Sequence, residues 1–300
     1  MLDFEHRFRT EEACRDYLIG LRWPGGFRCP RCGGTQYWTK SRNLLRCGRC
    51  RQDTSVIAGT IFSRSHLPLR VWFRAAWWAT NQKSGVTAIG LQRALGLGSY
   101  RTAWACLHKF RRAMVRPGRD HLQEAVEVDE VMVGGRHRGQ GGLHLGPTKS
   151  LVGIAVEVRG KGSGRIRLSR LASTSAESLE RFVRQTVAAG AEVRTDGRWG
   201  YGGVERLGYR HDPMVLTGKG KQASAALLPR VHRAASLLKR WLLGVHHGGI
   251  SKKHLDYYLD EFAFRFNRRS SPHRGMLFYR LLQQAVEIKP TPIAKLSGAA

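Results

Sequence analysis

Apolar and polar positions alternate along several short stretches in the second half of the chain, as they do in β-strands with one buried face. One of them is AVEVDEVMVGG, whose apolar members are Val126, Val128, Val131 and Val133. Further strands are expected at residues 150–158, 164–171 and 191–195. An amphipathic helix is expected over 175–187, where Ser175 can cap it. The pattern predicts three strands, a helix and a fourth strand.

The middle of the chain, from His66 to Met114, has its apolar residues at helical spacing instead. SGVTAIGLQRALGLGSYRTAWACLHKFRRAM predicts a helix over about 86–95, a turn at 96–99 and a second helix over about 100–115. A glycine-containing turn between two short helices, the second rich in Arg and Lys, is typical of helix-turn-helix DNA-binding modules. Many helical hairpins with this pattern only pack against their neighbours, so that alternative stays open.

The charge of the chain narrows the classes of partner. It has a net charge of +29, and the stretch from Pro213 to Leu255 has eight Lys or Arg and no acid. Such a field attracts polyanions, above all nucleic acid, although a solvated basic surface is the alternative. Because no run of eighteen apolar residues and no apolar leader segment occur, we expect a cytoplasmic protein and not a membrane or secreted one.

Four of the six cysteines form two C-x-x-C pairs in CPRCGGTQYWTKSRNLLRCGRC. Thiolates at this spacing can close a tetrahedron around a structural Zn²⁺, with a short hairpin between the pairs. The expected ligands are Cys29, Cys32, Cys47 and Cys50. Buried cysteines without a metal are the alternative, whereas a redox C-x-x-C would need only one pair. Cys14 and Cys106 stand alone in apolar helical surroundings and are expected to be inert core thiols.

The predicted strand order is that of a ribonuclease-H-like sheet, which holds one carboxylate in its first strand and another just after the fourth. Asp129 lies within the Val-rich first strand, where an unpaired carboxylate is costly, and Asp196 follows the fourth strand in TDG. Two carboxylates on neighbouring strands can share two Mg²⁺ ions, which clamp the reacting oxygens in phosphoryl transfer. An ordinary turn or surface acid is the alternative for each aspartate.

With these features the chain resembles bacterial insertion-sequence transposases of the DDE superfamily, ISXO-like, that carry an N-terminal zinc ribbon. The matching segments are the ribbon cysteines, VDEVMVGG, TDG and SLLKRWLLGVHHGGISKKHLDYYLDEFAFRFNRR at 236–269. The resemblance covers roughly residues 15–285. It implies a ribonuclease-H-like catalytic domain, a divalent metal, and cut-and-join chemistry on the ends of the element.

The third metal ligand departs from the DDE pattern, which adds a Glu on a helix with Lys or Arg seven residues on. The helix VHRAASLLKRWL has no acid and places His232 seven residues before Lys239, on one face. His232 could replace the acid as a nitrogen ligand, which suits Mn²⁺ better than Mg²⁺, or it could contact DNA. Glu261 is the other candidate, with Arg265 and Arg268 four and seven residues on, unless it forms a plain helix salt bridge.

The expected fold class is α/β (α+β), multidomain. The expected parts are a helical lead-in, a zinc ribbon, a helix-turn-helix region, a ribonuclease-H-like catalytic domain and a tail, at 1–22, 23–60, 61–120, 121–290 and 291–300. The residues expected to contact the DNA backbone are Arg101, Lys109, Arg111, Arg112, Lys239, Lys252, Lys253, Arg265, Arg268 and Arg269.

In this hypothesis a nucleoid-associated protein binds terminal inverted repeats and target DNA. Asp129 and Asp196, helped by His232 or Glu261, hold Mg²⁺ or Mn²⁺ for phosphodiester hydrolysis and strand transfer. Pairing two ends calls for a homo-oligomer. The alternatives are a DNA-binding regulator with an inert second half, a stand-alone nuclease, and an inactive copy.

Overall fold

The helical and strand-rich parts of the sequence form two units in the computed structural model. The structure describes residues 2–41, 43–116, 118–134, 149–214, 227–247 and 250–297. Unit 1 comprises Met1–Arg116 and Ser271–Ala300, and unit 2 comprises Pro117–Ser270. No helix in the described ranges is long and apolar enough to cross a membrane.

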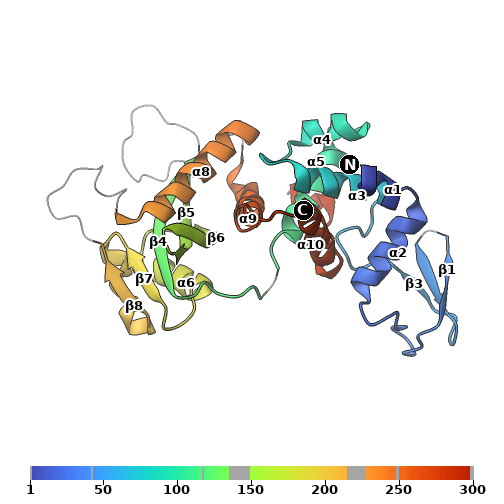
Figure 1. The fold of residues 1–300 in the computed structure, drawn as a ribbon, viewed down its shortest axis with the longest axis horizontal. Helices are drawn as coiled ribbons and strands as arrows, with labels where there is room; N and C mark the ends of the chain where they lie inside the picture. The colour runs from blue at the N-terminus through green and yellow to red at the C-terminus, as the bar shows by residue number, and fades with distance from the viewer. Residues whose placement is uncertain are drawn as a thin grey trace. The chain divides into compact units, whose positions relative to one another are not determined.

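Unit 1 is a helical bundle with a small sheet. Its helices are α1 (Leu2–Arg7), α2 (Glu11–Arg22), α3 (Leu69–Asn81), α4 (Ala88–Leu95), α5 (Tyr100–Ala113), α10 (Arg274–Glu287) and α11 (Ile293–Ser297). Aromatic rings hold the bundle together: Phe278 of α10 packs against Phe4, Phe73 and Trp77, with ring centroids 5.5–5.8 Å apart. The bundle core therefore needs a helix from the far end of the chain (Figure 1).

The position of α10 corrects the expected domain boundary. The sequence pattern assigns residues up to 290 to the catalytic domain, but α10 packs on α2, α3 and α5 of unit 1. The reason is the apolar face of α10, whose Leu277, Phe278, Leu281 and Leu282 are all buried.

The small sheet has the order β1-β2-β3 and is antiparallel. Its strands are β1 (Tyr37–Lys40), β2 (Leu44–Cys47) and β3 (Asp53–Ser55). Asp53 ties the three strands together, because its carboxylate accepts hydrogen bonds from Arg46 Nε at 2.7 Å and Lys40 Nζ at 3.1 Å. Leu45 is fully buried beneath them. This is the hairpin expected between the cysteine pairs, with one further strand.

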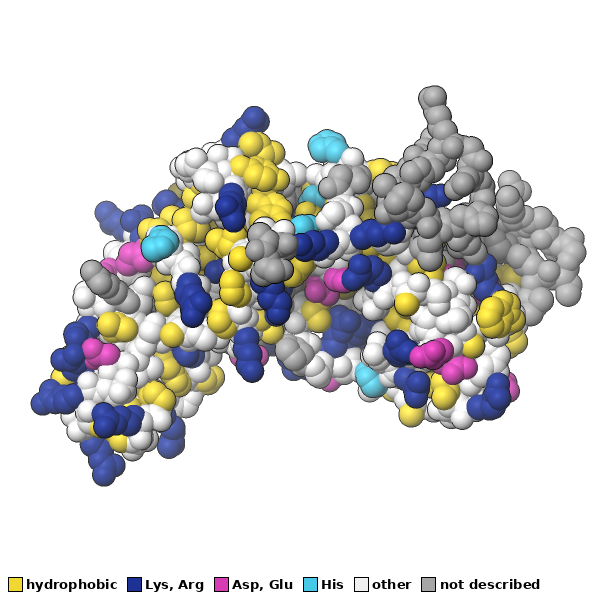
Figure 2. Space-filling model, turned by 180° about the vertical axis from the view of Figure 1, so that it is seen from behind, with side chains coloured by type: hydrophobic (Ala, Val, Ile, Leu, Met, Phe, Trp, Pro, Cys, Tyr) yellow, Lys and Arg dark blue, Asp and Glu magenta, His cyan; other side chains and the backbone are white. Residues whose placement is uncertain are grey.

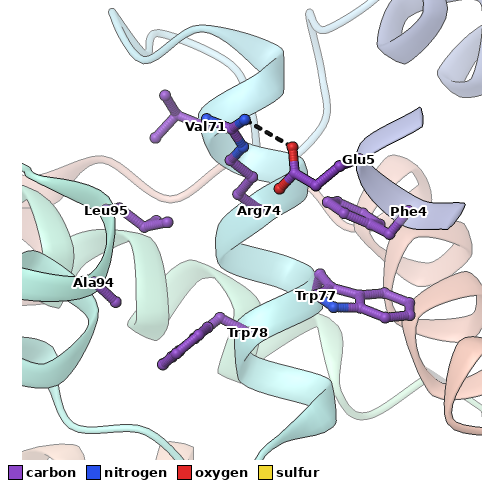
Figure 3. Close-up of a pocket in the computed structure, with 8 residues that line it drawn as sticks. All are labelled: Phe4, Glu5, Val71, Arg74, Trp77, Trp78, Ala94 and Leu95. Atoms are coloured by element: carbon purple, nitrogen blue, oxygen red, sulfur yellow. Dashed lines mark hydrogen bonds and ion pairs between the residues drawn. The ribbon is translucent and has the colours of Figure 1, made fainter. Parts of the chain in front are cut away.

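The helical hairpin of α4 and α5 begins and ends within two residues of the predicted bounds. Thr87 caps α4, and Gly96 ends it in the left-handed conformation with φ +62°, which a residue without Cβ adopts at little cost. A cavity of about 220 Å³ lies beside α4. Among the residues that line it, Arg74 donates a hydrogen bond to Glu5 (Figure 3). Its lining is Phe4, Glu5, Val71, Arg74, Trp77, Trp78, Ala94 and Leu95.

Unit 2 is built on a five-stranded sheet of order β6-β5-β4-β7-β8 (Figure 1). The strands are β4 (Ala125–Gly134), β5 (Lys149–Arg159), β6 (Gly162–Leu171), β7 (Glu192–Thr195) and β8 (Arg210–Pro213). The first three pair antiparallel, and β7 and β8 add parallel to β4. This mixed sheet confirms the expected fold class, and β8 adds a strand to those that the sequence pattern predicts.

Helices cover both faces of this sheet. The helices are α6 (Ala176–Thr186), α8 (Pro229–His246) and α9 (Leu255–Phe266), with 3₁₀ turns η1 (Trp199–Tyr201), η2 (Glu205–Leu207) and η3 (Lys252–His254). Val126 and Val128 of β4 lie in the apolar cluster with α6. Val133 lies in the other cluster, with α8 and α9. Polar residues of β4 that share the face of Val133 therefore point toward α8 or α9.

Candidate functional site

Asp129 stands near the centre of the sheet, on β4. It is two residues from Val131 and four from Val133, so it points to the face that α8 and α9 cover. The side chain is 19% exposed, and one carboxylate oxygen accepts the backbone N–H of Glu130 at 2.8 Å. A carboxylate held this deep is costly unless a cation or donors balance it.

Asp196 comes beside Asp129 because β7 runs parallel to β4. The strands pair Ala125 with Glu192 and Glu127 with Arg194. Each aspartate lies two residues after a member of this second pair. Burial, then the charges of Glu130 and Asp196, raises the pKa of Asp129 to about 7. The expected pair of carboxylates therefore lies close enough to interact electrostatically.

His232 is the third member that the structure brings to this place. Its Nδ1 lies 3.8 Å from an Asp129 carboxylate oxygen, and its side chain is 36% exposed. It sits in the first turn of α8, which begins at Pro229. Lys239 is exposed on the same helix. The His232 imidazole of α8 thus lies beside Asp129 of β4, which also interacts electrostatically with Asp196 just after β7.

Glu261, the other candidate third ligand, has a different environment. It is 2% exposed on α9, and its Oε1 accepts hydrogen bonds from Arg265 at 2.7 and 2.9 Å. Helix α9 packs on β6, which β5 separates from β4. The helix salt bridge considered from the sequence is therefore formed, and His232 is the candidate that contacts Asp129.

Two buried glutamates at the site were missed by sequence reasoning. Glu130, which points to the other face, accepts hydrogen bonds from Arg198 at 2.6 Å and Tyr201 at 2.8 Å. Because Arg198 also donates its backbone N–H to Asp196 at 3.1 Å, this group ties the loop of Asp196 to β4. Glu127, at 1% exposure, bonds to the start of α8. The sequence signal for them is three acids within four positions of an otherwise apolar, Val-rich strand.

The second candidate site is the cysteine cluster of unit 1. Among the described residues, its four cysteines form a group tight enough to hold a metal ion, because their sulfur atoms all lie within 4.8 Å of one another. Backbone N–H groups of Cys50 and Arg49 help lower the pKa of Cys47 to about 6, which favours the thiolate that a metal needs. The donor set fits tetrahedral Zn²⁺, with no position left for substrate.

The residues of α5 that are expected to contact DNA differ in how far their side chains are buried. Arg101 is exposed and Arg112 half-buried, but Lys109 and Arg111 are only 6% and 2% exposed. Lys109 donates to the Ser63 carbonyl at 3.2 Å. The expectation that Lys109 and Arg111 meet phosphate is therefore wrong for this structure, because both side chains belong to the bundle interior.

The basic residues of unit 2 that are expected to contact DNA also differ: some are exposed, and others pair with neighbouring side chains. Those on the surface are Lys239, Lys252, Lys253 and Arg269. Arg265 pairs with Glu261, and Arg268 lies over the Phe264 ring at 4.1 Å. Figure 2 shows Lys and Arg scattered over one face of the protein, with fewer acids among them. The surface therefore carries the charge expected of a polyanion-binding protein.

Comparisons with known proteins agree with this arrangement. Residues 121–267 match the ISXO2-like transposase domain family, and residues 9–53 match the transposase zinc-ribbon domain. The chain is also 27% identical over 278 residues to an uncharacterized protein in transposable element ISH50 of Halobacterium salinarum, a match that covers 86% of this chain and 91% of that protein. The two aspartates and His232 fall inside the first matched region, and the four cysteines inside the second. The chain thus combines a region that matches the ISXO2-like transposase domain family, over residues 121–267, with one that matches the transposase zinc-ribbon domain, over residues 9–53.

Proposed function

We propose that this transposase binds the terminal inverted repeats of its element and catalyses metal-dependent hydrolysis and strand transfer of phosphodiesters. The observation that carries the proposal is the surroundings of Asp129 on β4: His232 of α8 lies 3.8 Å away, and the charge of Asp196, just after β7, helps raise its pKa. Two like charges near a desolvated carboxylate are unfavourable by themselves, and a bound cation would reverse that.

The donor set suits a divalent metal. Carboxylate oxygens take Mg²⁺ or Mn²⁺, and the imidazole nitrogen shifts the preference toward Mn²⁺. Such a metal, when bound, supplies charge stabilisation at the phosphate and an activated oxygen nucleophile. The chain contributes the fixed positions: Asp129 on a central strand, Asp196 on a loop tied to Glu130, and His232 on the first turn of a helix.

We propose that the zinc ribbon and the α4–α5 hairpin bind the DNA. Arg101 on α5 and Lys239 on α8 are exposed cations suited to phosphate, which positions DNA without reading its sequence. Two ends must be held together for joining, so we infer a homo-oligomer on DNA. The same reaction implies double-stranded target DNA as the second substrate and a place on the nucleoid in the cytoplasm.

The test is cleavage and strand transfer on the element's own end, in Mg²⁺ and in Mn²⁺. Asp129→Ala, Asp196→Ala and His232→Ala should each lower activity at least ~100-fold, since each removes a metal ligand. Glu192→Ala is the matched control: it removes an acid of β7 that pairs with Arg194, and it should cut normally.

Each other outcome has a definite meaning. If Glu261→Ala, and not His232→Ala, abolishes cleavage in either metal, the assignment of the third ligand is wrong. If the wild type binds the end but never cuts it, the protein is a DNA-binding regulator or an inactive copy. Cleavage without strand transfer would indicate a nuclease.

A further inference from the structure

We propose that Glu127 is a positioning residue that sets His232 against Asp129 by capping the start of α8. The inference rests on the proposed function, because it takes His232 as a metal ligand. Glu127 itself would not touch the metal or the DNA. It would act through the helix that carries the ligand.

The contacts of Glu127 are those of a helix cap supplied by a strand. Its Oε2 accepts the backbone N–H groups of Arg230 at 2.7 Å and Val231 at 2.9 Å. Its Oε1 accepts from the Arg230 guanidinium at 2.8 Å. The carboxylate is 1% exposed, so these donors replace the water it would otherwise bind. The negative charge also lies at the positive end of the helix dipole.

Helix α8 lacks a cap of its own. Its N-cap residue is Leu228, which offers no side-chain acceptor, and Pro229 occupies the first helical position. The first N–H groups of a helix need an outside partner, and here Glu127 of β4 provides it. The start of α8 is thereby tied to one residue of the sheet. Leu228 and Val231, each 1% exposed, pack the same turn against the core.

The spacing along both elements links this cap to the site. Glu127 and Asp129 are two residues apart on one strand and share a face. Val231, which Glu127 binds, is followed directly by His232, which lies near Asp129. The residues of the cap and those of the proposed metal site are therefore neighbours on β4 and on α8. A shift of the first turn of α8 away from Glu127 would also move His232 relative to Asp129.

His232 depends on this cap because the contact with Asp129 does not hold it. The separation of 3.8 Å is too long for a hydrogen bond, and the imidazole is partly exposed. Its position therefore follows from where the first turn of α8 sits. Metal sites lose affinity when the groups that orient their ligands are changed, typically by ~10–100-fold.

The experiment measures Mn²⁺ binding to the full, zinc-loaded protein without DNA, by the loss of the free Mn²⁺ signal in electron paramagnetic resonance. Asp129→Ala defines the binding that belongs to this site. Glu127→Gln should weaken it ~10-fold or more, since the amide keeps one acceptor oxygen and loses the charge. Glu127→Asp, which keeps the charge but shortens the reach, should also weaken it.

The matched control is Glu157→Gln on β5. Glu157 is 4% exposed and pairs with Arg165 at 2.6 Å, and it also accepts backbone N–H groups of Gln123 and Arg165. Its loss should lower the melting temperature about as much as Glu127→Gln while leaving Mn²⁺ affinity unchanged. That separates positioning from general stability.

The outcomes distinguish this inference from the proposed function. If Asp129→Ala and His232→Ala weaken Mn²⁺ binding but folded Glu127→Gln and Glu127→Asp bind like wild type, the positioning role is refuted. Equal weakening by Glu157→Gln would also refute it. If wild type shows no Mn²⁺ binding that depends on Asp129 and His232, the proposed metal site fails instead.

Discussion

Asp129 is harder to ionise in the folded chain than in the unfolded one. Burial and the charges of Glu130 and Asp196 raise its pKa from 3.8 to about 7. The folded state therefore holds a proton more tightly, and ionisation of Asp129 costs stability as the pH rises through this range. The same crowding of negative charge favours a bound cation, so the arrangement that lowers stability is the one that the proposed metal site requires.

A pH-dependent gain in stability follows for Asp129→Asn. Without divalent metal, the variant should be more stable than wild type by on the order of 2 kcal/mol near neutral pH, because the amide never ionises. The gain should grow between pH 4 and pH 7 and then level off. Urea unfolding of both proteins across this range measures it. A difference that does not change with pH would contradict the electrostatic cause.

Gly153 makes a second prediction at the residue scale. It lies on β5 opposite Glu130, and a Cβ there would be 2.9 Å from the ring of the buried Phe182. Gly153→Ala should therefore destabilise unit 2 by ~1–3 kcal/mol, through overpacking. Gly244→Ala on α8, where a Cβ meets nothing within 4 Å, is the control for thermal unfolding and should not destabilise. Equal melting temperatures for both variants would show that Phe182 repacks freely.

At the scale of elements, the zinc ribbon is the part that depends on a ligand. The strands β1, β2 and β3 have three or four residues each, and few of their side chains are buried. A sheet of this size needs its metal to fold. Unit 2 has its own apolar clusters, so the ribbon and the sheet of unit 2 should respond differently to metal loss.

Removal of zinc tests that difference. Cys47→Ser should bind no zinc and lose protection of ribbon amides in hydrogen exchange, while amides of β4 and β5 stay protected. Cys14→Ala changes a buried thiol outside the cluster and should keep its zinc. If the ribbon stays protected without zinc, its packing on α2, through Arg22 and the carbonyls of Ser55 and Val56, suffices to hold it.

Local signals predicted most elements well because their causes are local. Gly96 ends α4 through its own backbone conformation, and Ser175 caps α6 because its hydroxyl oxygen accepts the backbone N–H of Ser178. Strand β8 was missed, since its residues RHDP have no apolar alternation and it forms only by pairing with β7. Lys109 and Arg111 were misjudged because a basic helix does not reveal which of its cations another helix will cover.

At the scale of the whole molecule, the net charge of +29 governs the encounter with DNA. Cations that replace counterions on phosphate make binding fall steeply with salt. Because Lys109 and Arg111 are buried, exposed residues such as Arg101 must carry that dependence.

The salt dependence of binding to the element's end is therefore a direct test. Arg101→Ala should reduce the slope of log affinity against log salt by about 1, and the loss should be similar for unrelated DNA sequences. Arg181→Ala, whose guanidinium already pairs with Glu177 on α6, is the matched control and should leave the slope unchanged. A slope that Arg101→Ala does not alter would remove α5 from the proposed DNA interface.

The sequence by itself predicted the cysteine cluster, the main strands and the helical hairpin, and its motifs indicated the resemblance to transposases. These depend on spacing, on alternation and on residues that act within a few positions of one another. Only the tertiary structure decided that α10 completes unit 1, that Glu261 pairs with Arg265, and that His232 lies by Asp129. It also revealed Glu127 as the cap of α8. Such contacts join residues up to about a hundred positions apart in the chain, where packing and the satisfaction of buried polar groups select the partner and no local pattern records the choice.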